Sequence, residues 1–282
     1  MLTRLLLLTD PRVNLGKEVC QVWWNQTSVR CRCRALLAIL FAFVCFLSTS
    51  LVAHADSAAD ANRLLDLIFP PGTEWASFPV VKWDHRPSVD IVFEPSVSKG
   101  EIDSIRDVVQ ALNTNAPIAN FSIEQVGGSE SLGLERAKAA ELVVIVGAHA
   151  IEKAAGPYKE ILLDVVPTEQ DAETAVSAAV ANQQPGLTRY RFDYSDGKLR
   201  RAVTFIDANG SPGRLGGVLS VSLLFSFAPS LASSPPPMLL LQRTNTGHKS
   251  ISPVGYDFLR LLYSSKIPPG IGRDALQDQL GR

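Results

Sequence analysis

The 282-residue sequence has little cysteine, and none in the part expected to fold. All four cysteines lie within the first 45 residues: Cys20, Cys31, Cys33 and Cys45. No disulfide can therefore hold the rest of the chain together, so its stability has to come from a hydrophobic core. An excess of positive charge is missing as well. The formal net charge is −1, which excludes the broad basic footprint of a nucleic-acid-binding protein.

Catalytic signatures are also absent. The sequence has no His-Glu-x-x-His zinc motif, no Gly-x-Ser-x-Gly nucleophile turn, no Walker A loop and no Gly-x-Gly-x-x-Gly fingerprint. Ser96 and Lys99 have the Ser-x-x-Lys spacing of some acyltransferases, but the partner motifs are missing and Ser98 suits a helix cap. These absences favour a protein that is not an enzyme and that needs neither a cofactor nor a metal.

The three parts of a secretory signal follow one another near the start. The basic run 30–34 precedes a strictly apolar stretch of 13 residues, 35–47, and Ala53 and Ala55 form a small-residue exit. We expect a signal peptide over 29–55, cleavage after Ala55 and a periplasmic or secreted protein. The alternative is an uncleaved anchor, because the whole uncharged run approaches the roughly 20 residues that span a bilayer.

The residues before this leader fit no signal pattern, so we interpret 1–28 as an over-extended gene start. Removal of 1–55 takes away six of the 27 basic and two of the 28 acidic residues, which leaves a net charge of −5. The expected mature protein is therefore mildly acidic and free of cysteine. Its contact with the membrane is limited to the leader before cleavage.

Hydrophobic periodicity predicts an α+β fold for the mature chain. Helical patterns cover 57–69, 99–112, 169–182, 214–228 and 253–264, and strand patterns cover 88–94, 118–125 and 141–147. The clearest hairpin is 187–207, with Asp196-Gly197 as its turn. Helices and strands do not alternate strictly, which favours a mixed sheet packed by the central apolar helix and a C-terminal helix.

These elements define the expected domain organisation. Residues 56–72 form an N-terminal helix and linker, 73–272 form one globular domain, and 273–282 form a tail after Pro268-Pro269-Gly270.

One short cluster is the best candidate for a ligand site. Trp83, Asp84, His85 and Arg86 join an aromatic face, an acid, a titratable imidazole and a guanidinium where a strand is expected to end. The alternative is a Trp–Arg stack around a turn. His248 is the other candidate, in a predicted loop, whereas His149 is interpreted as a structural histidine after a buried strand.

The C-terminal part resembles a family of uncharacterised exported proteobacterial proteins that carry a domain with zincin-like architecture. The likeness covers most of 75–272, and its specific part is the motif Ile251-Ser252-x-x-x-Tyr256-Asp257-x-Leu259-Arg260-x-Leu262-Tyr263 followed by Ile267-Pro268-Pro269-Gly270-Ile271. Where such a fold presents an acidic or His-bearing helix, this chain has the apolar and serine-containing segment 219–226. The resemblance therefore implies a degenerate member without zinc.

Two functions are compatible with the sequence. The first is a non-catalytic binding or structural module on a metallopeptidase-like scaffold, with an unknown partner. The second is a hydrolase whose site is assembled from loops around Asp84, His85 and His248.

Overall fold

The computed structural model describes residues 62–125, 138–208, 212–233, 239–244 and 249–280. The chain divides into two units, Met1–Ser57 and Ala58–Arg282, and all of the described residues belong to the second. Ala53 and Ala55 of the expected leader, and the candidate His248, lie outside the described residues. Within the described ranges, no helix combines the length and apolar character needed to cross a membrane.

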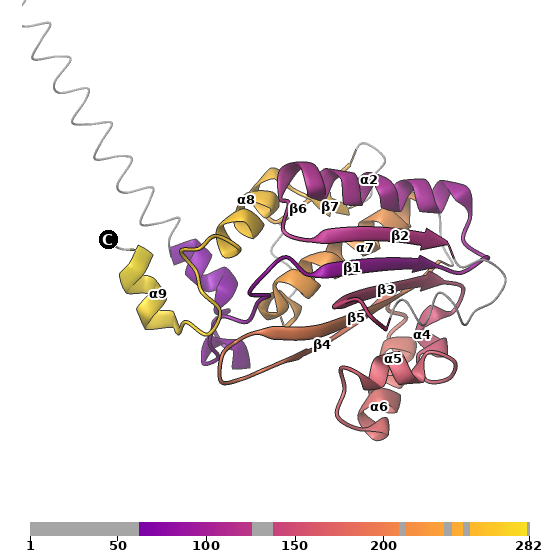
Figure 1. Cartoon of the computed structure of the whole chain (residues 1–282), viewed down its shortest axis with the longest axis horizontal. Helices are drawn as coiled ribbons and strands as arrows, with labels where there is room; N and C mark the ends of the chain where they lie inside the picture. Colours follow the sequence, from indigo (N-terminus) through magenta and orange to yellow (C-terminus); the bar gives the residue numbers. More distant parts are fainter. Residues whose placement is uncertain (1–61, 126–137, 209–211, 234–238, 245–248, 281–282) are drawn as a thin grey trace, which may run out of the picture. The chain divides into compact units, whose positions relative to one another are not determined.

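A five-stranded sheet is the centre of the fold (Figure 1). Its strands are β1 Ser88–Phe93, β2 Asn120–Gln125, β3 Leu142–Gly147, β4 Gly186–Phe192 and β5 Leu199–Asp207. They lie in the order β2-β1-β3-β5-β4, with every neighbouring pair parallel except β4 and β5, which are antiparallel. The sheet is therefore mixed, and the predicted α+β class is confirmed.

Helices cover both faces of this sheet (Figure 1). They are α2 Lys99–Asn115, α4 Ala150–Lys153, α5 Lys159–Leu163, α6 Glu169–Ala181, α7 Pro212–Phe227, α8 Pro253–Leu262 and α9 Arg273–Leu280, with the 3-10 turns η1 Glu74–Ala76 and η2 Pro229–Ser233. A second, two-stranded antiparallel sheet pairs β6 Leu241–Arg243 with β7 Lys249–Ile251. Residues 62–68 are also helical.

The alternation of side chains along β3 divides the core into two layers. All six residues of β3 are buried, as the β-branched run predicts. Val144 and Val146 belong to a cluster that includes α2, α7 and α8, whereas Val143 and Ile145 belong to one that includes α4, α5 and α6. Since successive side chains of a strand point to opposite faces, these clusters are the two faces of the sheet.

The predicted hairpin and central apolar helix are both confirmed. β4 pairs with β5 over nearly their whole length, and Gly197 in the connecting turn has φ of +64°. α7 packs against β4, β5 and α2, and Leu219, Leu223 and Leu224 on it are fully buried. Gly216 permits the close approach of α2, because an added Cβ would lie 2.6 Å from Oγ of Ser104.

Two parts of the fold differ from the sequence analysis. The short helices α4 and α5 after β3 are not anticipated, because neither is long enough to produce a clear helical period. Residues 273–280, predicted as part of a C-terminal tail, form α9, and Leu276 on this helix is fully buried against the core. This helix is too short to show a clear amphipathic period, and it follows Pro268-Pro269-Gly270, which indicates the end of a domain.

Candidate functional site

The predicted site residues 83–86 lie at the amino ends of the parallel strands. They belong to the segment that leads into β1, and this segment is joined to the start of β5 through a bridge between Lys82 and Lys198. Lys82 N–H donates to the carbonyl of Gly197, and Leu199 N–H donates to the carbonyl of Lys82. The segment is therefore held against the β4–β5 turn before it enters the sheet.

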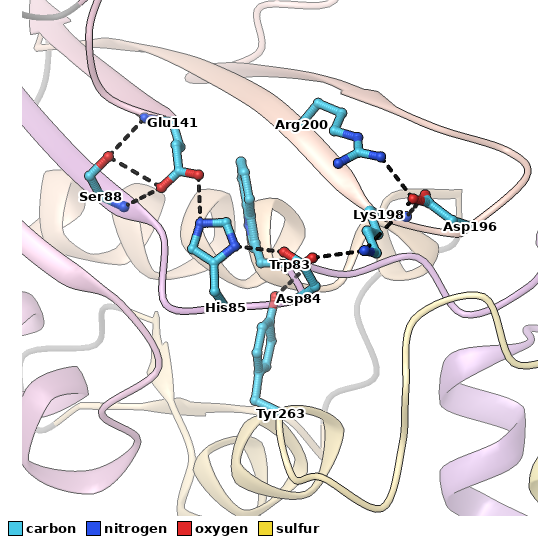
Figure 2. A network of polar contacts seen from close by, with 9 residues as sticks. All are labelled: Trp83, Asp84, His85, Ser88, Glu141, Asp196, Lys198, Arg200 and Tyr263. Carbon is cyan, nitrogen blue, oxygen red and sulfur yellow. Dashed lines mark hydrogen bonds and ion pairs between the residues drawn. The ribbon is translucent and has the colours of Figure 1, made fainter.

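His85 is placed between two carboxylates (Figure 2). Its Nδ1 lies 2.6 Å from Oδ1 of Asp84, and its Nε2 lies 2.6 Å from Oε1 of Glu141, the residue directly before β3. The hydrogen bond with Asp84, helped by that with Glu141, raises the pKa of His85 above its ordinary value of 6.5. Both ring nitrogens donate when the imidazole is protonated, so this arrangement stabilises the imidazolium.

The two carboxylates are themselves held from other sides. The N–H of Ser88 donates to Oε2 of Glu141 at 2.9 Å, and the N–H of Glu141 donates to Oγ of Ser88 at 3.1 Å. Asp84 Oδ2 lies 3.0 Å from Nζ of Lys198. Hydrogen bonds from His85 and Lys198 lower the pKa of Asp84. The network thus connects the start of β1 and of β3 with the β4–β5 hairpin.

Trp83 faces the opposite way, into the core. It is 1% exposed, and its indole Nε1–H donates to the carbonyl of Ser226 on α7 at 3.2 Å. No arginine stacks on this ring in the part of the chain that the structure describes. A buried indole with its donor satisfied is a packing residue.

Lys82, which the sequence analysis does not single out, is buried beside this tryptophan. Its Nζ donates to the carbonyl of Leu262 at 2.6 Å, at the C-terminus of α8, and lies 5.3 Å from the ring centre of Tyr263. Burial lowers the pKa of Lys82 to about 8. An ammonium at the last carbonyls of a helix is favourable because these oxygens carry partial negative charge.

A cavity of about 550 Å³ opens next to the network. Lys82, Asp84, His85 and Arg86 line it, together with Arg260 and Tyr263. Arg86 is exposed and makes no hydrogen bond or ion pair within the described ranges. The candidate residues therefore do border a space that a small molecule could enter.

The chemistry of His85 is limited by its two partners. A general base needs a free nitrogen facing the proton that it removes, and here each nitrogen already faces a carboxylate oxygen. The nearby hydroxyl of Ser88 contacts Glu141 and not His85, so no nucleophile–base pair is formed. The contacts of His85 with Asp84 and Glu141, here called the His85 clamp, join the ends of neighbouring strands.

The side chains of α7, the helix that contains the segment 219–226, do not fit a zinc ion. Ser226 Oγ donates to the carbonyl of Ser222, and Ser220 Oγ donates to the carbonyl of Gly216, both within α7. Ser230 Oγ, in the following turn η2, donates to the carbonyl of Leu67. Hydroxyls that are bonded to backbone carbonyls in this way are poor metal ligands. No group of three His, Cys, Asp or Glu side chains suited to a metal occurs among the described residues.

A second polar cluster lies at the carboxyl ends of β1 and β3, and sequence reasoning missed it. Glu94 follows β1 and receives hydrogen bonds from Lys153 Nζ at 2.7 and 2.8 Å and from the hydroxyl of Tyr158. An acid directly after a buried strand is the only local signal of this cluster. His149, interpreted from the sequence as a structural histidine after a buried strand, is exposed there with φ of 57°, and its Nδ1 lies 3.5 Å from Oε2 of Glu152.

Comparison of the chain with models of protein families, with curated proteins and with solved structures found no match.

Proposed function

We propose that this chain is an exported, non-catalytic binding module on a degenerate metallopeptidase-like scaffold. The observation that carries the proposal is the side-chain set of α7. The helix leaves β5 and packs along the sheet, and its polar residues in the stretch 219–226 are serines alone. A catalytic zinc needs about three protein ligands and an activated water, which serine hydroxyls do not supply.

Binding is the property that the same geometry leaves available. Two cavities within the described ranges, of about 550 and 610 Å³, have the size of ordinary ligand sites. The first is lined by the clamp of His85, and the second lies between β4 and α7. The proposed location is periplasmic or extracellular, and it rests on the leader pattern alone.

The proposal is tested on protein made from the full chain and purified without an affinity tag. We expect a mature N-terminus at Asp56, substoichiometric zinc by elemental analysis, and no cleavage of a mixed peptide library by mass spectrometry. Stoichiometric zinc together with peptide cleavage would overturn the non-catalytic function. A full-length chain found in the cytoplasm, or held in the membrane by 35–53, would overturn export.

The hydrolase remains the second candidate, because Asp84 and His85 line a cavity and share a short hydrogen bond. Its test is His85→Gln against wild type with a panel of ester substrates. Activity that disappears in this variant, at a temperature and pH where both proteins remain folded, would favour the hydrolase. No activity in either protein supports the binding module.

A further inference from the structure

β4 is an edge strand of the sheet, with β5 as its one neighbouring strand among the described residues (Figure 1). The carbonyl of Pro185 accepts from the N–H of Asp207, which makes this pair a hydrogen-bonded one, and such pairs alternate along an antiparallel ladder. The backbone N–H and C=O groups of Thr188 and Tyr190 therefore point away from β5. A strand edge of this kind can pair with an added strand.

This edge borders a groove shared with α7. The cavity there measures about 610 Å³. Val218, Val221 and Phe225 of α7 form one wall, and Thr188 and Tyr190 of β4 form the other. An extended peptide that pairs with β4 would place alternate side chains over the apolar wall, because side chains of a strand alternate in direction.

The charge of the groove has one sign. Arg189, Arg214 and Lys249 line it, and no Asp or Glu is found among its lining residues in the described chain. None of the three cations forms an ion pair within the described ranges. Cations that lack carboxylate partners beside an apolar wall favour a ligand that brings its own negative charge.

The guanidinium of Arg189 lies at the free edge of β4. Its guanidinium donates to the carbonyl of Thr188 at 2.8 Å, and this carbonyl belongs to the free edge. The guanidinium therefore covers the position of an incoming backbone N–H. A carboxylate on the incoming segment offers it a charge-assisted hydrogen bond in exchange, which is stronger than the bond to a neutral carbonyl.

We propose that the groove between β4 and α7 binds an acidic polypeptide segment, which adds to β4 as an extended strand. The inference rests on the proposed binding function and names its partner class. A second copy of this chain is disfavoured as the occupant, because pairing two β4 edges would bring the Arg189 cations of both copies together. The adjoining cavity of about 290 Å³ shares Arg214 with the groove but is also lined by Glu101, Glu152 and Asp207, so the proposed preference for an acidic segment applies to the groove between β4 and α7 alone.

The test uses the intact mature protein and three short fluorescent peptides. In the first, glutamate alternates with valine; in the second, glutamine replaces glutamate; the third repeats the first with N-methyl groups on alternate backbone nitrogens. We expect the first to bind by fluorescence polarisation. We expect the other two to bind about tenfold more weakly or not at all, because they lack the charge or the strand pairing. Added salt should weaken binding of the first peptide.

Variants of the protein test whether the peptide binds in this groove. Arg214→Gln combined with Lys249→Gln should weaken the acidic peptide about tenfold, and both side chains are exposed, so folding is not at risk. Lys266→Gln is the matched control, since this exposed lysine lies outside the groove and should leave binding unchanged.

Each outcome has a distinct meaning. Equal binding of the glutamate and glutamine peptides, or no binding of any peptide, overturns the acidic-strand inference and leaves the non-catalytic function standing. Equal binding of the N-methylated peptide also overturns it, and would favour a small anionic ligand. A salt-sensitive dimer in which a second copy of the chain occupies the groove would overturn it as well. Cleavage of the bound peptide, read by mass spectrometry of the same sample, overturns the non-catalytic function instead.

Discussion

The Nε2 of His85 lies 2.6 Å from Oε1 of Glu141, a residue 56 positions further along the chain. This contact joins the segment before β1 to the residue before β3, and the neighbouring contact with Asp84 extends it to Lys198 at the start of the returning strand of the hairpin. The carboxylates of Asp84 and Glu141 and the imidazole of His85 are partly exposed, so we expect these contacts to contribute about 1 kcal/mol or less to the stability of the fold.

The first prediction concerns the pH dependence of this clamp. The pKa of His85 is raised, so the contribution is complete below 6.5 and is lost as pH rises through the higher pKa of the folded protein. The pKa of Asp84 is lowered, so its contribution is present above 3.8 and is lost as pH falls through the lower folded value. His85→Gln should therefore destabilise the protein at about pH 6 and much less at about pH 9.

Urea unfolding at both pH values measures the difference between wild type and variant. His149→Gln serves as the control, because its exposed ring lies at the opposite ends of the strands, 3.5 Å from Glu152, and takes no part in the contacts of His85. A loss of stability in His85→Gln that is the same at both pH values would contradict an ionised clamp.

The second prediction concerns Lys82 at alkaline pH. Its pKa is about 8 in the folded protein and 10.5 when exposed, so between these values the unfolded chain holds a proton that the folded one has released. Stability therefore rises with pH across this window because of Lys82. Lys82→Met should remove that rise. A difference profile between wild type and variant that stays flat from about pH 8 to 10 would contradict the effect of burial on the ammonium.

Local sequence determines the parts of the fold that could be predicted. The capping box of Ser98 and Glu101 starts α2 as expected, and Asp196-Gly197 closes the hairpin, because both signals lie within a few residues of the structure that they form. The uniformly β-branched run of β3 likewise predicts a strand buried on both faces.

The candidate site could be predicted only in part. Asp84 and His85 are adjacent in sequence, and their pairing follows from that. Glu141 joins them because β1 and β3 run parallel with Val89 opposite Leu142, a register that no local pattern encodes. The same register brings Glu94 and Lys153 together at the other ends of the strands. Parallel pairing across a long connection is a property of the whole fold.

The third prediction uses this second cluster. Glu94 is buried, with 11% of its side chain exposed, whereas 35% of the Lys153 side chain is exposed. Lys153→Met leaves a carboxylate in the interior and should cost about 3 kcal/mol, whereas Glu94→Gln leaves an ammonium that can reach water and should cost less. The double variant should cost less than the sum of the two, because the groups interact directly. Equal and additive losses in a urea double-mutant cycle would contradict a coupled pair.

The last prediction concerns the glycine of the hairpin turn. Gly197 has φ of +64°, and an added Cβ would lie 2.3 Å from the carbonyl oxygen of Val80 and 2.4 Å from the nitrogen of Gly270. These neighbours are backbone atoms, which cannot rotate away as a side chain does. Gly197→Ala combines an unfavourable φ with a backbone clash and should lower the free energy of unfolding by about 2 kcal/mol or more.

Gly100→Ala is the matched control for this substitution. Gly100 lies in the first turn of α2 with no heavy atom within 4 Å of an added Cβ, so alanine should be neutral or stabilise the helix by up to about 1 kcal/mol. The opposite signs of two identical substitutions separate the clash at the turn from any general effect of replacing glycine. If urea unfolding gives Gly197→Ala the stability of wild type, the turn does not pack beneath Val80 and Gly270, and the attachment of the 82–86 segment to the hairpin has to be revised with it.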